Sequence, residues 1–264
     1  MKRSLFLSLV VLLFAIVSCG NKANTTKPDE GKSDTLMNEK EYIKADVYET
    51  NKGALKVTLI GHASLMFEYA GKVIFVDPYS AVGDYSKLPK ADFVILTHEH
   101  SDHLDTAAIN AIKKADTHYI VSKVCNEILG YGDVMSNGDD KILADFAINA
   151  VPAYNIVNKN PQGMFYHPKG RGNGYVFTFG DKKVYVAGDT ENIPEMDALK
   201  GTIDIAFLPK NLPYTMTDDM FVDAAKKVQP KVLYPYHMSE FNKDKISKAL
   251  EGTNIQLEVR PMKN

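Results

Sequence analysis

Short apolar runs bounded by turn residues dominate this chain, and their lengths predict strands more often than helices. A first set of strand candidates lies at 57–60, 65–69, 73–76, 93–96, 119–121 and 142–150. A second set follows Gly174, at 175–179, 184–187, 203–208 and 232–236. Helical spacing of apolar residues appears at 106–114 and around 218–228.

The two sets of strands share one arrangement. In each set a hairpin ends in an aspartate, Asp77 in the first and Asp189 in the second, and an apolar strand follows further on. This arrangement predicts an α/β fold in which two sheets pack face to face with helices outside. A ligand site is then expected where the strand ends converge.

The first residues have the pattern of a bacterial signal peptide. Two basic residues precede the apolar run 5–17, which is too short to span a bilayer as a helix. Ile16-Val17-Ser18-Cys19 resembles a lipobox, so we expect residues 1–19 to be a lipoprotein signal peptide with acylation at Cys19. Acyl chains would anchor the protein to a membrane of the cell envelope, at its periplasmic or outer face. An ordinary secretory signal is the alternative.

The composition changes after the signal sequence. Residues 20–50 are rich in polar side chains, which predicts a flexible tether, and residues 51–264 then form one domain. The formal net charge is −2 and no basic block occurs, so nucleic acid is not an expected partner. Apart from Cys19 the only cysteine is Cys125, which we expect to be a buried small apolar side chain.

The segment Thr97–His103 carries most of the chemical information. It brings His98, His100, Asp102 and His103 together directly after a predicted strand. Neutral imidazole and carboxylate suit zinc, manganese or iron, and the lack of a nearby cysteine argues against a closed structural zinc site. A polar loop with scattered histidines is the alternative, but clustered histidines are typical of metal ligation or proton transfer.

Several motifs carry a resemblance to a known family. Those that resemble the metallo-β-lactamase superfamily are His-x-His-x-Asp-His at 98–103, Gly-Asp-Thr at 188–190 and Pro-Tyr-His at 235–237. Gly61-His62-Ala63-Ser64 and His167-Pro168-Lys169-Gly170 resemble its branch of ascorbate-6-phosphate lactonase-like hydrolases. The N-acyl-phosphatidylethanolamine phospholipase D group is a more distant relative. The resemblance covers about residues 54–260 and implies an αββα sandwich with one or two metals at its edge.

The resemblance also implies which side chains bind metal. The expected ligands are His98 and His100 for a first ion, Asp102, His103 and His237 for a second, and Asp189 as a bridge. Two divalent ions are expected, zinc ahead of manganese or iron. The third ligand of the first ion stays open. Relatives often have a histidine soon after a Pro-Ala pair, where this chain has Asn155; His167 is the favoured candidate, Asn155 is the alternative, and without either the enzyme would use one metal.

Other side chains are expected near the ions. Asp77 resembles a superfamily aspartate that supports the ligand loops by hydrogen bonds. His62 is expected either to contact a ligand or the substrate, or to be hydrogen-bonded within its own turn. Lys169, Arg171 and Tyr214 are candidates for substrate contact, with solvated loop side chains as the alternative.

The expected activity is hydrolysis by a metal-bound hydroxide, with Asp102 taking or returning a proton. The substrate would be an ester, lactone, amide or phosphodiester, as a small molecule or a lipid. A phospholipase D-like phosphodiesterase at the membrane and a metal-binding envelope protein without turnover are the alternatives. The bridging aspartate and the lactonase-like motifs disfavour true β-lactamase activity.

Overall fold

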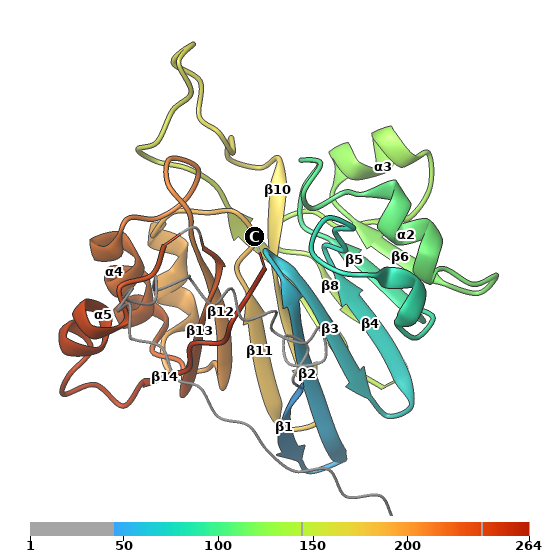
Figure 1. Ribbon diagram of the computed structural model, residues 1–264, viewed down its shortest axis with the longest axis horizontal. Coiled ribbons are helices and arrows are strands. Elements are labelled where there is room, and N and C mark those ends of the chain that lie inside the picture. Colours follow the sequence, from blue (N-terminus) through green and yellow to red (C-terminus); the bar gives the residue numbers. More distant parts are fainter. Residues whose placement is uncertain (1–44, 144, 239, 264) are drawn as a thin grey trace, which may run out of the picture. The chain divides into compact units, whose positions relative to one another are not determined.

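The structure is a computed structural model that describes residues 45–143, 145–238 and 240–263. The expected signal peptide, Cys19 and most of the expected tether lie outside these ranges. Within them, two seven-stranded sheets face each other and helices cover the two outer faces (Figure 1). The predicted αββα sandwich is confirmed.

The first sheet has the strand order β1-β2-β3-β4-β5-β6-β7. Strands β1 to β4 form an antiparallel meander, and β5 to β7 continue the sheet in parallel. The strands are β1 Ala45–Thr50, β2 Gly53–Gly61, β3 Ser64–Tyr69, β4 Lys72–Val76, β5 Phe93–Leu96, β6 His118–Val121 and β7 Asp133–Val134. Helices α2 Thr106–Ile112 and α3 Lys123–Leu129 pack against β5 and β6, and the short 3-10 helix η1 spans Tyr85–Lys87.

The second sheet repeats this plan in the order β14-β13-β12-β11-β10-β9-β8. Four strands are antiparallel and three continue in parallel. They are β8 Asp140–Ile142, β9 Ala147–Ala153, β10 Gly172–Phe179, β11 Lys182–Val186, β12 Ile205–Lys210, β13 Val232–Met238 and β14 Gln256–Leu257. Helices α4 Asp218–Val228 and α5 Lys243–Ala249 and the 3-10 helix η2 Pro194–Leu199 contribute to the apolar cluster on this sheet's other face.

Aromatic rings fill the space between the two sheets. The ring of Phe67 from the first sheet lies 5.4 Å from that of Phe177 in the second. Phe207 and Tyr234 stack at 5.0 Å on neighbouring strands of the second sheet, within the same apolar cluster. Such inward-facing aromatic pairs stabilise the sandwich beyond the burial of their area.

The predicted end of the tether at residue 50 is wrong, because residues 45–50 form β1 and pair with β2. β1 is an edge strand whose alternation of apolar and polar residues is weak. Its place depends on distant partners: Asp46 accepts hydrogen bonds at 3.0 Å from Arg260, and the hydroxyl of Tyr48 meets that of Tyr234. No local pattern encodes these contacts.

Two further outcomes concern single elements. The strand predicted at 142–150 is two strands, β8 and β9, which pair as a hairpin. Cys125 is buried on α3, as predicted. No helix in the described part of the chain is both long and apolar enough to cross a membrane.

Candidate metal centre

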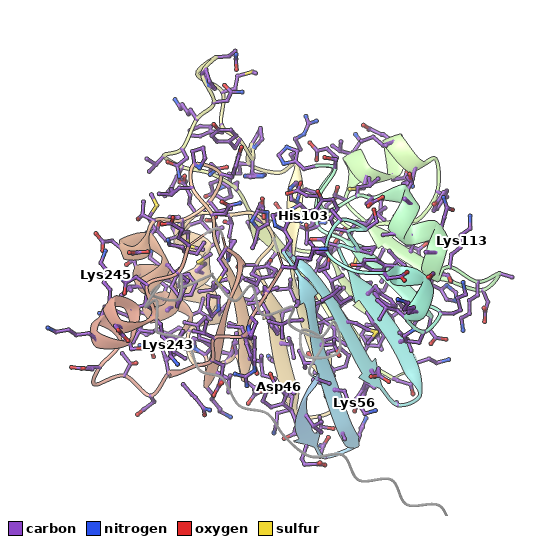
Figure 2. The ribbon with its side chains drawn as sticks, in the orientation of Figure 1. Asp46, Lys56, His103, Lys113, Lys243 and Lys245 are labelled. Carbon is purple, nitrogen blue, oxygen red and sulfur yellow. The ribbon has the colours of Figure 1, made fainter. Side chains whose placement is uncertain are left out.

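The histidine segment lies where β5 ends and α2 begins. β5 is buried along its whole length between β4 and β6, so its polar continuation emerges only at the edge of the sheet. The chain then turns tightly, with the backbone N–H groups of His103 and Leu104 both bonded to the carbonyl of His100. Asp105 caps α2 by accepting from the N–H groups of Ala107 and Ala108. His103 therefore lies at the edge where the strands of both sheets end (Figure 2).

Strained backbone marks the same edge. His62, Asp77 and His237 have φ angles of 49°, 45° and 46°, in a backbone region that residues other than glycine rarely adopt. The N–H of His237 donates to the carbonyl of His62 at 2.7 Å, and the N–H of His62 donates to the carbonyl of Lys263 at 2.7 Å. Residues held in such conformations concentrate at functional sites.

One group of side chains, the first cluster, consists of His98, His100, His167 and Asp189. Nε2 of His167 lies 3.2 Å from Nδ1 of His100 and 3.2 Å from Oδ2 of Asp189. Nε2 of His98 is 3.9 Å from the same carboxylate oxygen. The structure therefore brings His167, and not Asn155, to His98 and His100.

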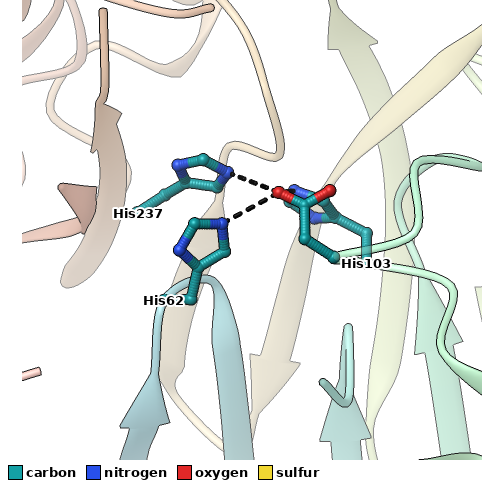
Figure 3. Close-up of side chains that lie close together, drawn as sticks. His62, His103 and His237 are labelled. Atoms are coloured by element: carbon teal, nitrogen blue, oxygen red, sulfur yellow. Dashed lines mark hydrogen bonds and ion pairs between the residues drawn. The ribbon is translucent and has the colours of Figure 1, made fainter. Parts of the chain in front are cut away.

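A second group, the second cluster, consists of His62, Asp102, His103 and His237. Three imidazole nitrogens surround Oδ2 of Asp102: Nε2 of His62 at 2.9 Å, of His237 at 3.4 Å and of His103 at 3.8 Å. Figure 3 shows this convergence, with dashed lines for the contacts of His62 and His237 with the carboxylate.

Asp189 lies between the two clusters. Its Oδ2 faces His167 and is 3.5 Å from Nε2 of His237, while its Oδ1 is 3.5 Å from Nε2 of His103. Each carboxylate oxygen can thus serve a different cation, as the predicted bridge requires.

The polar atoms at the centre fit a pair of divalent cations. Within the described residues, Nε2 of His98, His103 and His237 and Oδ1 of Asp189 are buried and have no hydrogen-bond partner. An unsatisfied buried donor or acceptor costs about 1–3 kcal/mol, so four of them converging on one place call for a shared partner. Imidazole nitrogens and carboxylates are ligands of zinc and related ions.

Hydrogen bonds behind the clusters set the tautomers. The buried carboxylate of Asp77 accepts from Nδ1 of His103 at 2.8 Å and from the hydroxyl of Thr97 at 2.6 Å. That hydroxyl in turn lies 2.9 Å from Nδ1 of His98. With Nδ1 protonated in both rings, Nε2 keeps its lone pair facing the centre. Asp77 thus supports the candidate ligands without belonging to either cluster.

The protonation states of the clustered side chains, His103 excepted, suit metal ligands. Burial lowers the pKa of His98 well below its usual value and also lowers that of His100, so both rings are neutral at pH 7. Burial also acts on His103, but the carboxylates of Asp189 and Asp77 outweigh it and raise the pKa of that ring, so a cation bound there would take the place of the proton on Nε2. The surrounding imidazoles hold the pKa of Asp102 and of Asp189 far below the usual range despite burial, so both carboxylates are ionised.

The candidates for substrate contact have separate positions. Lys169 bonds to Glu195 at 2.7 Å and lies over the ring of Tyr154, so its charge is already paired away from the clusters. Arg171 bonds through Nε to Glu99 and lines a hollow with His98, His100 and His167, the last of these on the 154–171 loop that joins β9 to β10. Tyr214 is half-exposed and its ring packs on Tyr166, which lines the same hollow.

Some residues at the centre were missed or undervalued in the sequence. His62 joins the second cluster directly, and only the Gly-His-Ala-Ser motif after a strand pointed to it. Thr97, Glu99 and Glu191 were not considered, because a threonine before a histidine cluster or a single glutamate carries no pattern. Asn155 contacts His167 instead of replacing it, with Oδ1 2.7 Å from Nδ1 of that ring.

A sandwich of two mixed sheets with two imidazole–carboxylate clusters at one edge defines a metallo-β-lactamase-fold protein. Residues 56–237 match the family model described as the beta-lactamase superfamily domain. A UPF0173 metal-dependent hydrolase of Flavobacterium johnsoniae is 30% identical over 204 residues, which cover 71% of this chain and 86% of that protein. The chain belongs to the metallo-β-lactamase superfamily and, within it, to the UPF0173 metal-dependent hydrolases.

Other relatives agree with this membership. A UPF0173 metal-dependent hydrolase of Ligilactobacillus salivarius is 29% identical over 71% of this chain and 86% of its own length. The crystal structure of a protein described as a metal-dependent hydrolase from Parabacteroides distasonis is 45% identical, with a TM-score of 0.80 over 84% of this chain and 100% of that one. A metallo hydrolase of Ignicoccus hospitalis shares the fold, with a TM-score of 0.66 at 23% identity over 79% and 96% of the two chains. The protein is a metal-dependent hydrolase. These matches do not specify the ascorbate-6-phosphate lactonase-like branch, which stays a prediction.

Proposed function

We propose that this protein is a binuclear hydrolase that cleaves an ester, lactone or phosphodiester. The observation that carries the proposal is the pair of clusters sharing Asp189, where buried nitrogen and oxygen atoms without hydrogen-bond partners among the described residues converge on one centre. His98, His100 and His167 would hold one zinc ion, Asp102, His103 and His237 would hold the other, and Asp189 would contact both. When bound, such a pair supplies a water acidified to a pKa of about 7 and polarises the substrate oxygen.

The protein's own groups would orient the reactants and move the proton. Oδ2 of Asp102 is engaged by His62, whereas its Oδ1 has no hydrogen-bond partner among the described residues and the side chain is 31% exposed. Oδ1 is thus the atom that would take a proton during attack and return it to the leaving group.

Arg171 is the cation we assign to substrate contact. It lines the hollow beside the first cluster, and its two terminal nitrogens have no partner within the described ranges. A guanidinium suits a phosphate or a carboxylate, since both accept paired hydrogen bonds. Lys169 is already paired, and we assign it no substrate role.

A phospholipase-like phosphodiesterase is the second candidate, and exposed apolar side chains favour it. Ile156, Val157 and Met164 of the 154–171 loop and Leu212 and Tyr214 of a neighbouring loop are between 42% and 61% exposed. The two loops meet where the amide of Asn155 donates to the carbonyl of Tyr214 at 2.9 Å. Apolar surface beside the centre suits a substrate with an apolar chain.

Acylation of Cys19 would place the enzyme on a membrane of the cell envelope, and we propose this location. The lipobox-like Ile16-Val17-Ser18-Cys19 supports it. Incorporation of labelled palmitate into the full chain, and its loss in Cys19→Ala, is the expected result. Release of an unlabelled, soluble wild-type protein would contradict the anchor.

Elemental analysis and a substrate panel test the function itself. The full chain, purified without added metal and then loaded with zinc, should hold two ions. It should turn over at least one of bis(p-nitrophenyl) phosphate, a p-nitrophenyl ester and a γ-lactone, and not a β-lactam. A parallel assay with phosphatidylethanolamine vesicles distinguishes a phospholipase-like activity from hydrolysis of a small molecule. A protein with two ions and no turnover on any arm would contradict the proposed substrate classes.

A further inference from the structure

Glu191 is a fully buried carboxylate two residues after Asp189, and it faces the start of the 154–171 loop. Its two oxygens accept hydrogen bonds from three successive backbone N–H groups, those of Ile156, Val157 and Asn158, at 2.6–2.7 Å. No cation pairs with it in the described part of the chain. Such a buried carboxylate is stabilised only if all these donors stay in place.

Asn155 adds the fourth donor and links Glu191 to the first cluster. Its Nδ2 donates to Oε1 of Glu191 at 3.0 Å and to the carbonyl of Tyr214 at 2.9 Å. Its Oδ1 accepts from the backbone N–H of His167 at 2.7 Å and lies 2.7 Å from Nδ1 of the same residue. Both donors and both lone pairs of this buried amide are therefore used.

These contacts fix the direction of the amide and, with it, the tautomer of His167. Carboxylate and carbonyl oxygens can only accept, so the NH₂ group of Asn155 must face Glu191 and Tyr214. Its oxygen must then face His167, whose Nδ1 has to carry the proton in order to donate. Nε2 keeps the lone pair, and this is the atom that lies 3.2 Å from Asp189 and from His100.

We propose that Asn155 and Glu191 are positioning residues that orient His167 and set its tautomer for the first metal ion. The inference rests on the proposed binuclear centre and adds two residues to it. His167 reaches the centre from a long loop and not from a strand end, so it depends on this chain of contacts. The amide at 155 thus supports a ligand instead of being one, which accounts for a histidine being absent at that position.

Metal binding by the full chain tests the proposal. We would measure ions per chain and the two zinc dissociation constants by competition with a chromophoric chelator, and record cobalt absorption spectra. Asn155→Ala should weaken one ion by about 10- to 100-fold, the range for loss of a hydrogen bond behind a histidine ligand, and leave the other unchanged. The cobalt spectrum of that one site should change.

Asn158→Ala is the matched control. Asn158 lies in the same loop, is bonded through its Nδ2 to the carbonyl of Thr215 at 2.7 Å, and does not contact His167. It should keep both dissociation constants. An equal loss of zinc affinity in Asn155→Ala and Asn158→Ala would overturn the proposal. So would two ions held at wild-type affinity by Asn155→Ala.

A rescue separates positioning from general damage to the loop. Asn155→Asp keeps an acceptor for His167 but sets two carboxylates face to face, so it should also weaken one ion. Adding Glu191→Gln turns the facing oxygen into a donor. The N–H of Asn158 then loses its acceptor, but the repulsion between two carboxylates is removed, so the double variant should bind that ion more tightly than Asn155→Asp alone; no recovery counts against the proposal. A wild-type chain that binds no ion would overturn both the centre and the inference, whereas two ions without turnover would contradict only the hydrolase.

Discussion

In the second cluster, two histidines are held by strained backbone at the edge of the sheets, whereas the first cluster takes one histidine from a long loop. His62 lies on the turn after β2 and His237 near the end of β13, both in left-handed conformations, and their backbones hydrogen-bond to each other. His167 instead reaches His98 and His100 from the 154–171 loop, through Asn155 and Glu191. The same kind of ligand is thus held in one place by backbone strain and in the other by a chain of buried hydrogen bonds.

The difference has a consequence for how each cluster tolerates change. A ligand on a strained turn moves only if the sheet edge moves, because its backbone is fixed by neighbouring strands. A ligand on a loop can be lost while the sheets stay intact. We therefore expect the two candidate sites to respond separately to most substitutions and together to only one.

Asp189→Ala should have the largest effect, because the two oxygens of this carboxylate face imidazoles of both clusters. Both ions should be lost and turnover should fall to background. Elemental analysis of the purified variant checks this. Thr58→Ser, at a buried position outside both clusters, is the control for metal lost during purification. One ion retained at full affinity would show that the carboxylate is not shared.

His100→Ala should remove the first ion and nearly all turnover while the second ion stays. His100 faces His167 in the first cluster and belongs to no group with His62. Stoichiometry near one ion per chain is the expected result, and unchanged metal content would refute the first site as drawn. Loss of both ions would contradict the expectation that the two clusters bind their ions independently.

His62→Ala tests the independence of the two clusters from the second cluster. The substitution removes the 2.9 Å contact to Asp102, so the second ion should bind about 10-fold more weakly and the first ion should be unaffected. Cobalt spectra decide whether His62 is itself a ligand, since loss of a ligand changes the coordination geometry and loss of a supporting hydrogen bond does not. Equal weakening of both ions would contradict the assignment of His62 to the second cluster.

Arg171→Ala should have the smallest effect, and only on substrate. It lines the hollow beside the first cluster, so KM for a phosphodiester should rise several-fold while kcat and KM for an uncharged ester change little. Lys169→Ala is the matched control, because that cation is paired with Glu195 and should leave both KM values unchanged. A similar rise for the two substrates would point to a general disturbance of the loop.

The sequence predicted the fold and most of the candidate site for one physical reason: close spacing along the chain gives close spacing at a strand end. His98, His100, Asp102 and His103 needed only the apolar run before them, and Asp189 and His237 follow apolar strands in the same way. The sandwich itself followed from the alternation of short apolar runs.

The remainder depended on contacts between distant parts of the chain. β1 is an edge strand held by Tyr234 and Arg260, and its own residues show no strong pattern. His62 reaches Asp102 only because the β2–β3 turn lies beside the end of β5. Glu191 is one glutamate among many until the loop folds over it. No spacing rule relates such pairs.

The carbonyl of Lys263 has a practical consequence for anyone who produces this protein. It holds the N–H of His62 and approaches Gly61 so closely that a side chain at 61 would collide with it. A purification tag or fluorescent fusion joined directly after residue 264 would therefore pull on the turn that carries His62, as would trimming the last few residues. A handle placed ahead of Ala45, or a generous spacer at the other end, would leave that turn undisturbed.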